Sequence, residues 1–143
     1  MDVRSILAAK GDDVAVIGTA ATVGAALEEL ARHNIGALVV SADGEHIEGI
    51  MTERDVARGL CLHGPDLLDR PVGEVMTVDV TTCHPDDTLP RLMAVMTELR
   101  TRHLPVVLDD CLVGIVSIGD VVKRRLDELE TLNDQMIQYI QGH

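Results

Sequence analysis

The sequence predicts a mixed α/β (α+β) fold made of two similar halves, each with the element order strand–helix–strand–strand–helix. Three observations lead to this prediction. A helical pattern of apolar residues that starts at Thr22 starts again at Thr88, 66 residues further along the chain. A short β-rich run follows each helical pattern. Each half then repeats a glycine, two apolar residues and a Thr/Ser-x-x-Asp helix start.

The first helix of each half is predicted from apolar residues at helical spacing. They are Val23, Ala26, Leu27, Leu30 and Ala31 in the first half and Leu89, Leu92, Met93 and Met96 in the second. This spacing places them along one side of a helix. Thr22 and Thr88 stand where N-cap residues belong, and Pro90 is tolerated in a first turn. Short apolar segments at residues 14–17 and 78–82 are predicted as the first strand of each half.

Two more strands, a turn and a second helix follow in each half. The predicted strand pairs are residues 37–40 with 49–51 and residues 104–108 with 114–116. Turn-forming residues at 42–45 and 109–110 predict hairpin connections between these strands. The second helices start at Thr52 and at Ser117.

The last helix is predicted to continue beyond its counterpart in the first half, and its apolar residues reach Ile140, just before Gly142. A unit of about 50 residues buries little apolar surface alone, so the halves are predicted to pack on each other. The predicted division is an N-terminal segment 1–13, a first repeat 14–62, a linker 63–77, a second repeat 78–126 and a C-terminal helical extension 127–143.

Composition and charge exclude several function classes. The 143 residues include no Trp, no Phe and one Tyr, whereas proteins that bind single-stranded nucleic acid stack the bases on aromatic side chains. The net charge of −12 disfavours contact with nucleic-acid phosphates. No apolar run reaches the length of a membrane span, and the first five residues do not resemble a signal peptide. We therefore expect a soluble cytoplasmic protein with neither nucleic acid nor membrane as partner.

No metal site and no catalytic centre are predicted. The six histidines lack the spacing of metal ligands, and the three widely spaced cysteines are expected to be reduced thiols. His103 has no nucleophile partner in the sequence. Walker, Gly-x-Ser-x-Gly and His-Glu-x-x-His motifs are absent from the sequence. We expect no enzymatic activity and no catalytic cofactor.

Three motifs resemble those of the tandem CBS-domain pair, or Bateman module. They are Gly-Ile-Met-Thr-x-x-Asp at residues 49–55, Gly-Ile-Val-Ser-x-x-Asp at 114–120 and Arg-His-Leu-Pro-Val-Val at 102–107. The resemblance covers residues 3 to 126 and implies a stand-alone, bacterial-type module. Its two repeats would form a pseudo-twofold pair with up to two adenosine-ligand sites in the cleft between them. The family's ligands include AMP, ADP, ATP, S-adenosylmethionine and nicotinamide dinucleotides such as NAD.

The resemblance also implies which residues bind the ligand. The carboxylates of Asp55 and Asp120 would bind ribose hydroxyls, as acidic residues do in dinucleotide-binding folds. Thr52 and Ser117 would face the ribose or a phosphate, because free N–H groups at a helix start attract anions. The apolar residues expected to line an adenine slot are Ile50, Val80, Pro105, Val106 and Ile115.

The two implied sites are not equal. Arg102 and His103 resemble the family's phosphate contacts, and a ligand that bridges the repeats would bring them together with Arg54. The site in the second repeat has fewer cations, and Lys10 is the residue that would supply one. The alternatives are that Arg54 is an exposed first-turn residue and that Lys10 is a solvated surface lysine.

The repeated Thr/Ser-x-x-Asp motif has a second interpretation, since it is also the signature of a capping box. Spacing alone favours capping, and the family context favours ligand binding. We therefore expect a regulatory module that senses an adenine nucleotide, acts as a homodimer and signals to a protein partner that the sequence does not identify. The alternative is a dimeric interaction or scaffold module that binds no nucleotide.

Overall fold

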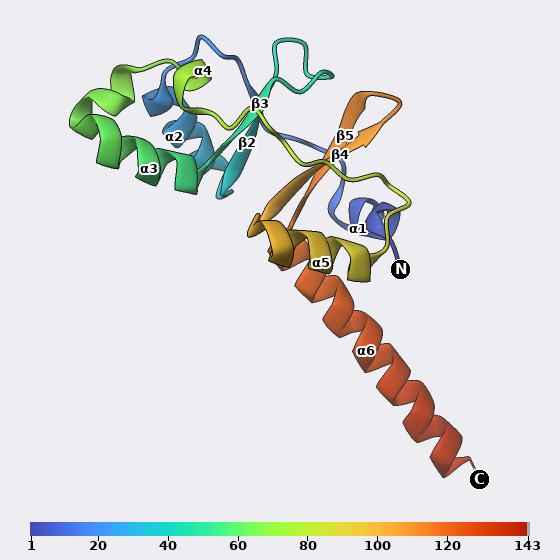
Figure 1. Cartoon of the computed structure of the whole chain (residues 1–143). Coiled ribbons are helices and arrows are strands. Elements are labelled where there is room, and N and C mark those ends of the chain that lie inside the picture. The colour runs from blue at the N-terminus through green and yellow to red at the C-terminus, as the bar shows by residue number, and fades with distance from the viewer. Residues whose placement is uncertain (143) are drawn as a thin grey trace.

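The computed structural model describes residues 1–142 and shows two repeats joined by an extended linker (Figure 1). The first repeat contains β1 (Val16–Ile17), α2 (Val23–His33), β2 (Ala37–Val40), β3 (Gly49–Thr52) and α3 (Glu53–His63). The second repeat contains α5 (Leu89–Leu99), β4 (His103–Leu108), β5 (Cys111–Ser117) and α6 (Ile118–Gln141). The short helices are α1 (Val3–Lys10), the 3₁₀ helix η1 (Gly64–Asp69) and α4 (Val72–Val75). The predicted mixed fold with a long C-terminal helix is confirmed.

The two sheets differ in one predicted strand. In the first repeat β1 runs parallel to β2, which pairs antiparallel with β3. The second repeat has only the antiparallel pair β4–β5, and residues 78–82 form no strand. Cys83 alone bridges to β4. The prediction of a strand at residues 78–82 is wrong. In the first repeat, the N–H of Val39 in β2 donates to the carbonyl of Ala15 at 3.2 Å. The equivalent residue of the second repeat, 66 positions later, is Pro105, and proline has no N–H to donate.

The short helices that precede one repeat pack into the core of the other. Val3 and Ile6 of α1 belong to the core of the second repeat, whereas Leu67 of η1 and Val72 of α4 belong to the core of the first. Val3, Leu67 and Val72 are completely buried. This exchange gives each small repeat the additional apolar surface that a unit of its size needs. The residue limits predicted for the repeats stay a prediction. The N-terminal segment and the linker, however, contribute buried side chains to the cores of the two repeats.

The exchanged segments occupy equivalent places in the two repeats. Asp2 bridges to Thr88 at the start of α5, just as Pro71 bridges to Thr22 at the start of α2. Both threonines are N-caps, as predicted, and each side-chain oxygen accepts the N–H three residues ahead. The backbone therefore has approximate twofold symmetry.

Helix α6 continues well beyond the second repeat and forms the long rod in Figure 1. It ends at Gln141, just before Gly142, as the apolar pattern predicts. Across residues 1–142, no helix combines the length and apolar character that crossing a membrane requires.

Candidate functional site

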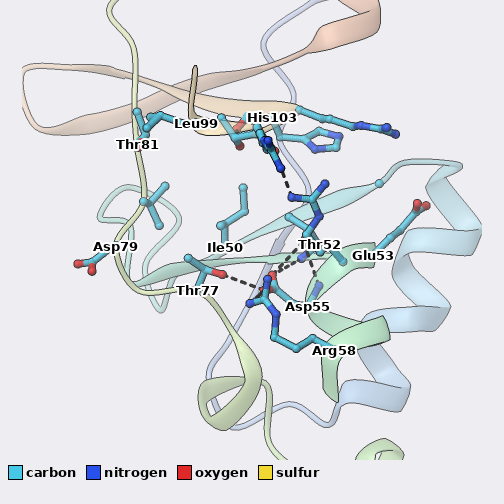
Figure 2. Close-up of a pocket in the computed structure, with 16 residues that line it drawn as sticks. Ile50, Thr52, Glu53, Asp55, Arg58, Thr77, Asp79, Thr81, Leu99 and His103 are labelled. Carbon is cyan, nitrogen blue, oxygen red and sulfur yellow. Dashed lines mark hydrogen bonds and ion pairs between the residues drawn. The ribbon is translucent and has the colours of Figure 1, made fainter. Parts of the chain in front are cut away.

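A cavity of about 490 Å³ lies between the two repeats. Its lining comes from the β3–α3 junction, from the segment at residues 77–81 that follows α4 and from the α5–β4 connection at residues 99–103. Seven of the predicted site residues line it: Ile50, Thr52, Arg54, Asp55, Val80, Arg102 and His103. Figure 2 shows Thr52, Asp55 and Thr77 on one side and Leu99 and His103 on the other. A volume of this size is within the range of small-molecule sites, about 300–1,000 Å³.

Asp55 is the buried carboxylate of this cavity and is 4% exposed. Its Oδ2 accepts hydrogen bonds from the backbone N–H of Thr52 at 2.9 Å and from the Thr52 hydroxyl at 3.0 Å. Its Oδ1 accepts a bond of 2.8 Å from the Thr77 hydroxyl and lies 3.8 Å from Nη1 of Arg58. The capping box is therefore formed, and the same carboxylate lines the cavity. A carboxylate has about four acceptor positions, so this one has capacity left.

Four arginines line the cavity: Arg54, Arg58, Arg100 and Arg102. They are four of only twelve basic residues in a chain with a net charge of −12. The acidic side chains in the lining are Glu53, Asp55 and Asp79, so the site has an excess of positive charge. Guanidinium groups bind phosphate oxygens in paired hydrogen bonds, which makes the site suited to an anionic group.

One of these arginines connects the two repeats. Arg54, in the first turn of α3, donates from Nη1 to the carbonyl of Arg100 at 3.2 Å. Arg100 ends α5 in the left-handed conformation, with φ of 53°. Arg54 is exposed in the first turn of α3, as the alternative interpretation states, and it also contacts the opposite side of the cavity.

His103 begins β4 and is partly buried where the two repeats meet. A Cβ added to Gly36 would lie 3.2 Å from Cε1 of His103, so the glycine leaves room for the ring. Burial lowers the pKa of His103 below its usual value, although the carboxylate of Glu53 partly opposes this. The imidazole is therefore held in its neutral form in the free protein.

The residues predicted for the second site do not line this cavity, although Ser117 pairs with His103 across the β4–β5 hairpin. Asp120 caps α6, and its Oδ2 accepts the backbone N–H of Ser117 at 2.9 Å. Lys10 donates to the same oxygen at 2.7 Å and to the carbonyl of Ile115 at 3.0 Å. Burial acts to raise the pKa of Asp120, but the hydrogen bonds from Lys10 and Ser117 and the charge of Lys10 together outweigh it, and the pKa is lowered. Lys10 is therefore an ion-pair partner and not a freely solvated lysine.

Pro105 lies away from the large cavity as well. It is buried in β4 and pairs with Ile115 across the β4–β5 hairpin. The structure thus separates the thirteen predicted residues into seven that share the cavity and six that do not: Lys10, Pro105, Val106, Ile115, Ser117 and Asp120. That any of them binds a ligand stays a prediction.

The lining residues that sequence reasoning missed include four with charged or hydroxyl side chains that the site chemistry uses: Arg58, Thr77, Asp79 and Arg100. Two had a local signal. Arg58 follows Arg54 by one helical turn, and Arg100 belongs to the run Arg-Thr-Arg-His at residues 100–103. The other two, Thr77 and Asp79, reach the site because the chain after α4 pairs with β3 at Ile50.

One group of possible metal ligands was not singled out from the sequence. Asp43, Glu45 and His46 lie exposed in the β2–β3 hairpin, with potential ligand atoms within 4.8 Å of one another. The carboxylate of Asp43 accepts the backbone N–H groups of Glu45 and His46 and contacts the His46 ring. These bonds form a tight turn, which accounts for the grouping.

Comparison with known proteins places these features in a family context. A family model described as CBS domain matches residues 3–61 and 72–127. The chain is 39% identical over 125 residues to the mitochondrial CBS domain-containing protein CBSX3 of Arabidopsis thaliana, covering 85% of this chain and 61% of the relative. This chain thus spans about three-fifths of that relative's length.

Two solved structures are similar to the whole fold. One is the CBS-domain containing protein ATU1752 from Agrobacterium tumefaciens, with a TM-score of 0.84, 42% identity and coverage of 87% of this chain and 99% of the other. The second is the CBS domain pair of protein MJ0100 in complex with methylthioadenosine and S-adenosyl-L-methionine. It has a TM-score of 0.75, 26% identity and coverage of 86% and 98%.

Proposed function

This chain belongs to the CBS-domain family as a tandem pair of repeats, and from that premise we propose that it is a regulatory module that binds an adenosine-containing ligand between the repeats. One observation carries the proposal: the buried carboxylate of Asp55 lines the same cavity as four arginines and His103. The bound adenosine compounds of the MJ0100 pair support the ligand class.

In the proposed complex, each part of the ligand contacts different chemistry. The ribose hydroxyls donate to Asp55, whose carboxylate has acceptor capacity left beside Thr52 and Thr77. The adenine packs against aliphatic side chains, because the cavity lining contains no Phe, Tyr or Trp and offers Ile50 and Val80 instead. The phosphates lie near the arginines, which also makes AMP, ADP, ATP or NAD a better match than the cationic S-adenosylmethionine.

Ligand binding would be transmitted through the contacts that already join the repeats. The linker at Thr77 and the Arg54–Arg100 contact both border the cavity. A ligand that bridges the two sides favours the arrangement that it fits best, and a change in that arrangement would alter affinity for a partner protein. We propose that the module acts as a homodimer in the cytoplasm and has no catalytic activity. Its unpaired cysteines fit a reducing compartment.

Thermal unfolding in the presence of AMP, ADP, ATP, NAD, S-adenosylmethionine and methylthioadenosine tests the proposal. A ligand at 100 times its dissociation constant stabilises the folded protein by about 2.7 kcal/mol, a shift of several degrees. Unfolding is followed by circular dichroism, since the chain has no Trp. We expect a shift with phosphate-bearing adenosine compounds. No shift with any compound would overturn the proposal.

Three variants separate ligand binding from capping. Asp55→Ala should abolish the shift, and Arg102→Ala should weaken it for phosphate-bearing ligands only. Thr22→Ala removes a helix cap outside the cavity, so it should lower stability and leave the shift intact. If Asp55→Ala behaves like Thr22→Ala, the carboxylate is a cap only.

A second candidate function is an interaction module that binds no nucleotide. It is favoured by the hydrogen bonds that Asp55 already receives within the chain. A protein that forms a stable assembly but shows no thermal shift with the six compounds would support this alternative.

A further inference from the structure

Helix α6 leaves a row of large apolar side chains exposed. Among its 24 residues only Val121 is buried. Leu126 is 56% exposed, Met136 58% and Ile140 69%. Soluble proteins rarely expose so many apolar side chains together unless another surface covers them.

The exposed row has the spacing of a coiled coil. Its members alternate at intervals of four and three residues: Val122, Leu126, Leu129, Asn133, Met136 and Ile140. In a heptad labelled a to g, Leu126, Asn133 and Ile140 occupy the a positions, and Val122, Leu129 and Met136 occupy the d positions. The row therefore forms one continuous seam, here called the α6 seam, with a single polar residue at Asn133.

The α6 seam faces away from the rest of the chain. The side of α6 that contacts the second repeat contains Val121, which is buried, and Glu128, which lies 3.5 Å from the N-terminal amine. In a helix with 3.6 residues per turn these two residues point about 100° or more away from the seam. The protein's own repeats therefore leave the α6 seam open to a partner.

We propose that the α6 seam pairs with the α6 seam of a second copy in a parallel, two-stranded coiled coil. Three features favour a second copy of α6 in parallel orientation as the partner. Asn133 would face its own counterpart, an arrangement in which one amide can bond the other. Arg125 at a g position would face Glu130 at the following e position of the second copy. Leu132 and Ile137, the next g–e pair, would widen the apolar contact.

The antiparallel arrangement is less favourable with the same residues. The register that keeps all apolar layers together would place Glu130 beside its own counterpart, so like charges would repel. It would also place Asn133 opposite Leu129 and leave the amide unpaired at the seam. The charge pattern of α6 therefore selects the parallel pair.

A membrane surface is a poorer partner for this helix. Amphipathic helices that bind membranes are rich in Lys and Arg on their polar side. Residues 118–141 contain three basic and five acidic residues, which gives a net charge of −2. A second copy of the helix supplies both the apolar surface and the opposite charges.

Sedimentation equilibrium of the full chain tests the proposal. The wild type should be a dimer. Replacing Leu129→Glu and Met136→Glu together should raise the dimer dissociation constant by about 100-fold or more, because two charges would be buried at the seam. The matched control Gln135→Glu with Gln138→Glu adds the same charge on the side of α6 away from the seam and should remain dimeric.

Charge exchange tests the orientation. Glu130→Arg should weaken the dimer, and adding Arg125→Glu to it should restore the affinity, which happens only if positions 125 and 130 face each other across the parallel pair. A monomeric wild type, a dimer unaffected by the seam variant, or no restoration by the exchange would overturn the proposal. The thermal-shift measurements address a different surface, so failure of nucleotide binding would leave this inference intact.

Discussion

The Thr77 hydroxyl donates a hydrogen bond of 2.8 Å to Oδ1 of Asp55 and so joins the linker to the capping box at the start of α3. Thr77 and Ile50 also exchange two backbone hydrogen bonds of 2.9 Å. At the equivalent cap in the second repeat, Asp120 receives the ammonium group of Lys10 instead. The two repeated carboxylates therefore accept hydrogen bonds from different long-range side chains, a neutral hydroxyl at Asp55 and a charged ammonium group at Asp120.

Removing the Thr77 hydroxyl should destabilise the protein. Thr77→Val keeps the shape of the side chain but removes a donor to a buried carboxylate, so we expect the free energy of unfolding to fall by about 2 kcal/mol. Urea unfolding followed by far-UV circular dichroism measures it. Thr97→Val is the control, because its hydroxyl bonds an exposed helix carbonyl, and it should change stability by less than about 0.5 kcal/mol. Equal losses in both variants would contradict the assignment.

The Lys10–Asp120 contact should make stability depend on pH. Because the pKa of Asp120 is lower in the folded protein, its contribution is present above the unfolded pKa of about 3.9 and is lost as pH falls through the folded value. Lys10→Met should therefore cost about 1 kcal/mol at neutral pH and much less in acid.

Urea unfolding at pH 7 and near pH 3 compares the Lys10→Met variant with the wild type. Arg4→Met serves as the control, since Arg4 and Asp86 form a contact of similar length with both side chains more than half exposed. It should have little effect at either pH. A Lys10→Met deficit that is unchanged in acid would argue against the ion pair as its source.

His103 should couple ligand binding to proton uptake. The ring is neutral in the free protein because burial lowers its pKa, and a phosphate beside it would favour the charged form. The affinity for NAD, whose pyrophosphate does not titrate near neutrality, should rise as pH falls from 8 to about 6. Isothermal calorimetry in buffers of different ionisation enthalpy measures the proton uptake. His103→Gln should abolish the pH dependence, and a variant that retains it would place the titrating group elsewhere.

Gly49→Ala should disturb the packing between β3 and the linker at Met76 and Thr77. A Cβ at this position would lie 2.6 Å from Sδ of Met76 and 2.8 Å from the carbonyl of Thr77, which is backbone and cannot easily move. We expect a loss of about 2 kcal/mol or more in urea unfolding. Gly18→Ala has open space around its Cβ and should be neutral or slightly stabilising. Similar behaviour of the two alanines would show that the linker adjusts freely.

Local patterns in the sequence were sufficient for most elements. The helix starting after Thr22 and the one starting after Thr88 follow from an N-cap and an apolar stripe within the same ten residues. The prediction at residues 78–82 failed because a strand needs a partner with a free N–H, and Pro105, more than twenty residues away, lacks one.

The sequence by itself determined the two repeats, the capping motifs at Asp55 and Asp120 and the length of α6, because each depends on residues that are neighbours along the chain. Only the tertiary structure decided which repeat each short helix completes, since Val3 and Val72 are equally apolar and each packs against residues far from it in sequence. The same is true of the cavity. Thr77 and Arg100 join Asp55 there because long-range packing brings three separate segments together, and that contact has no local signature.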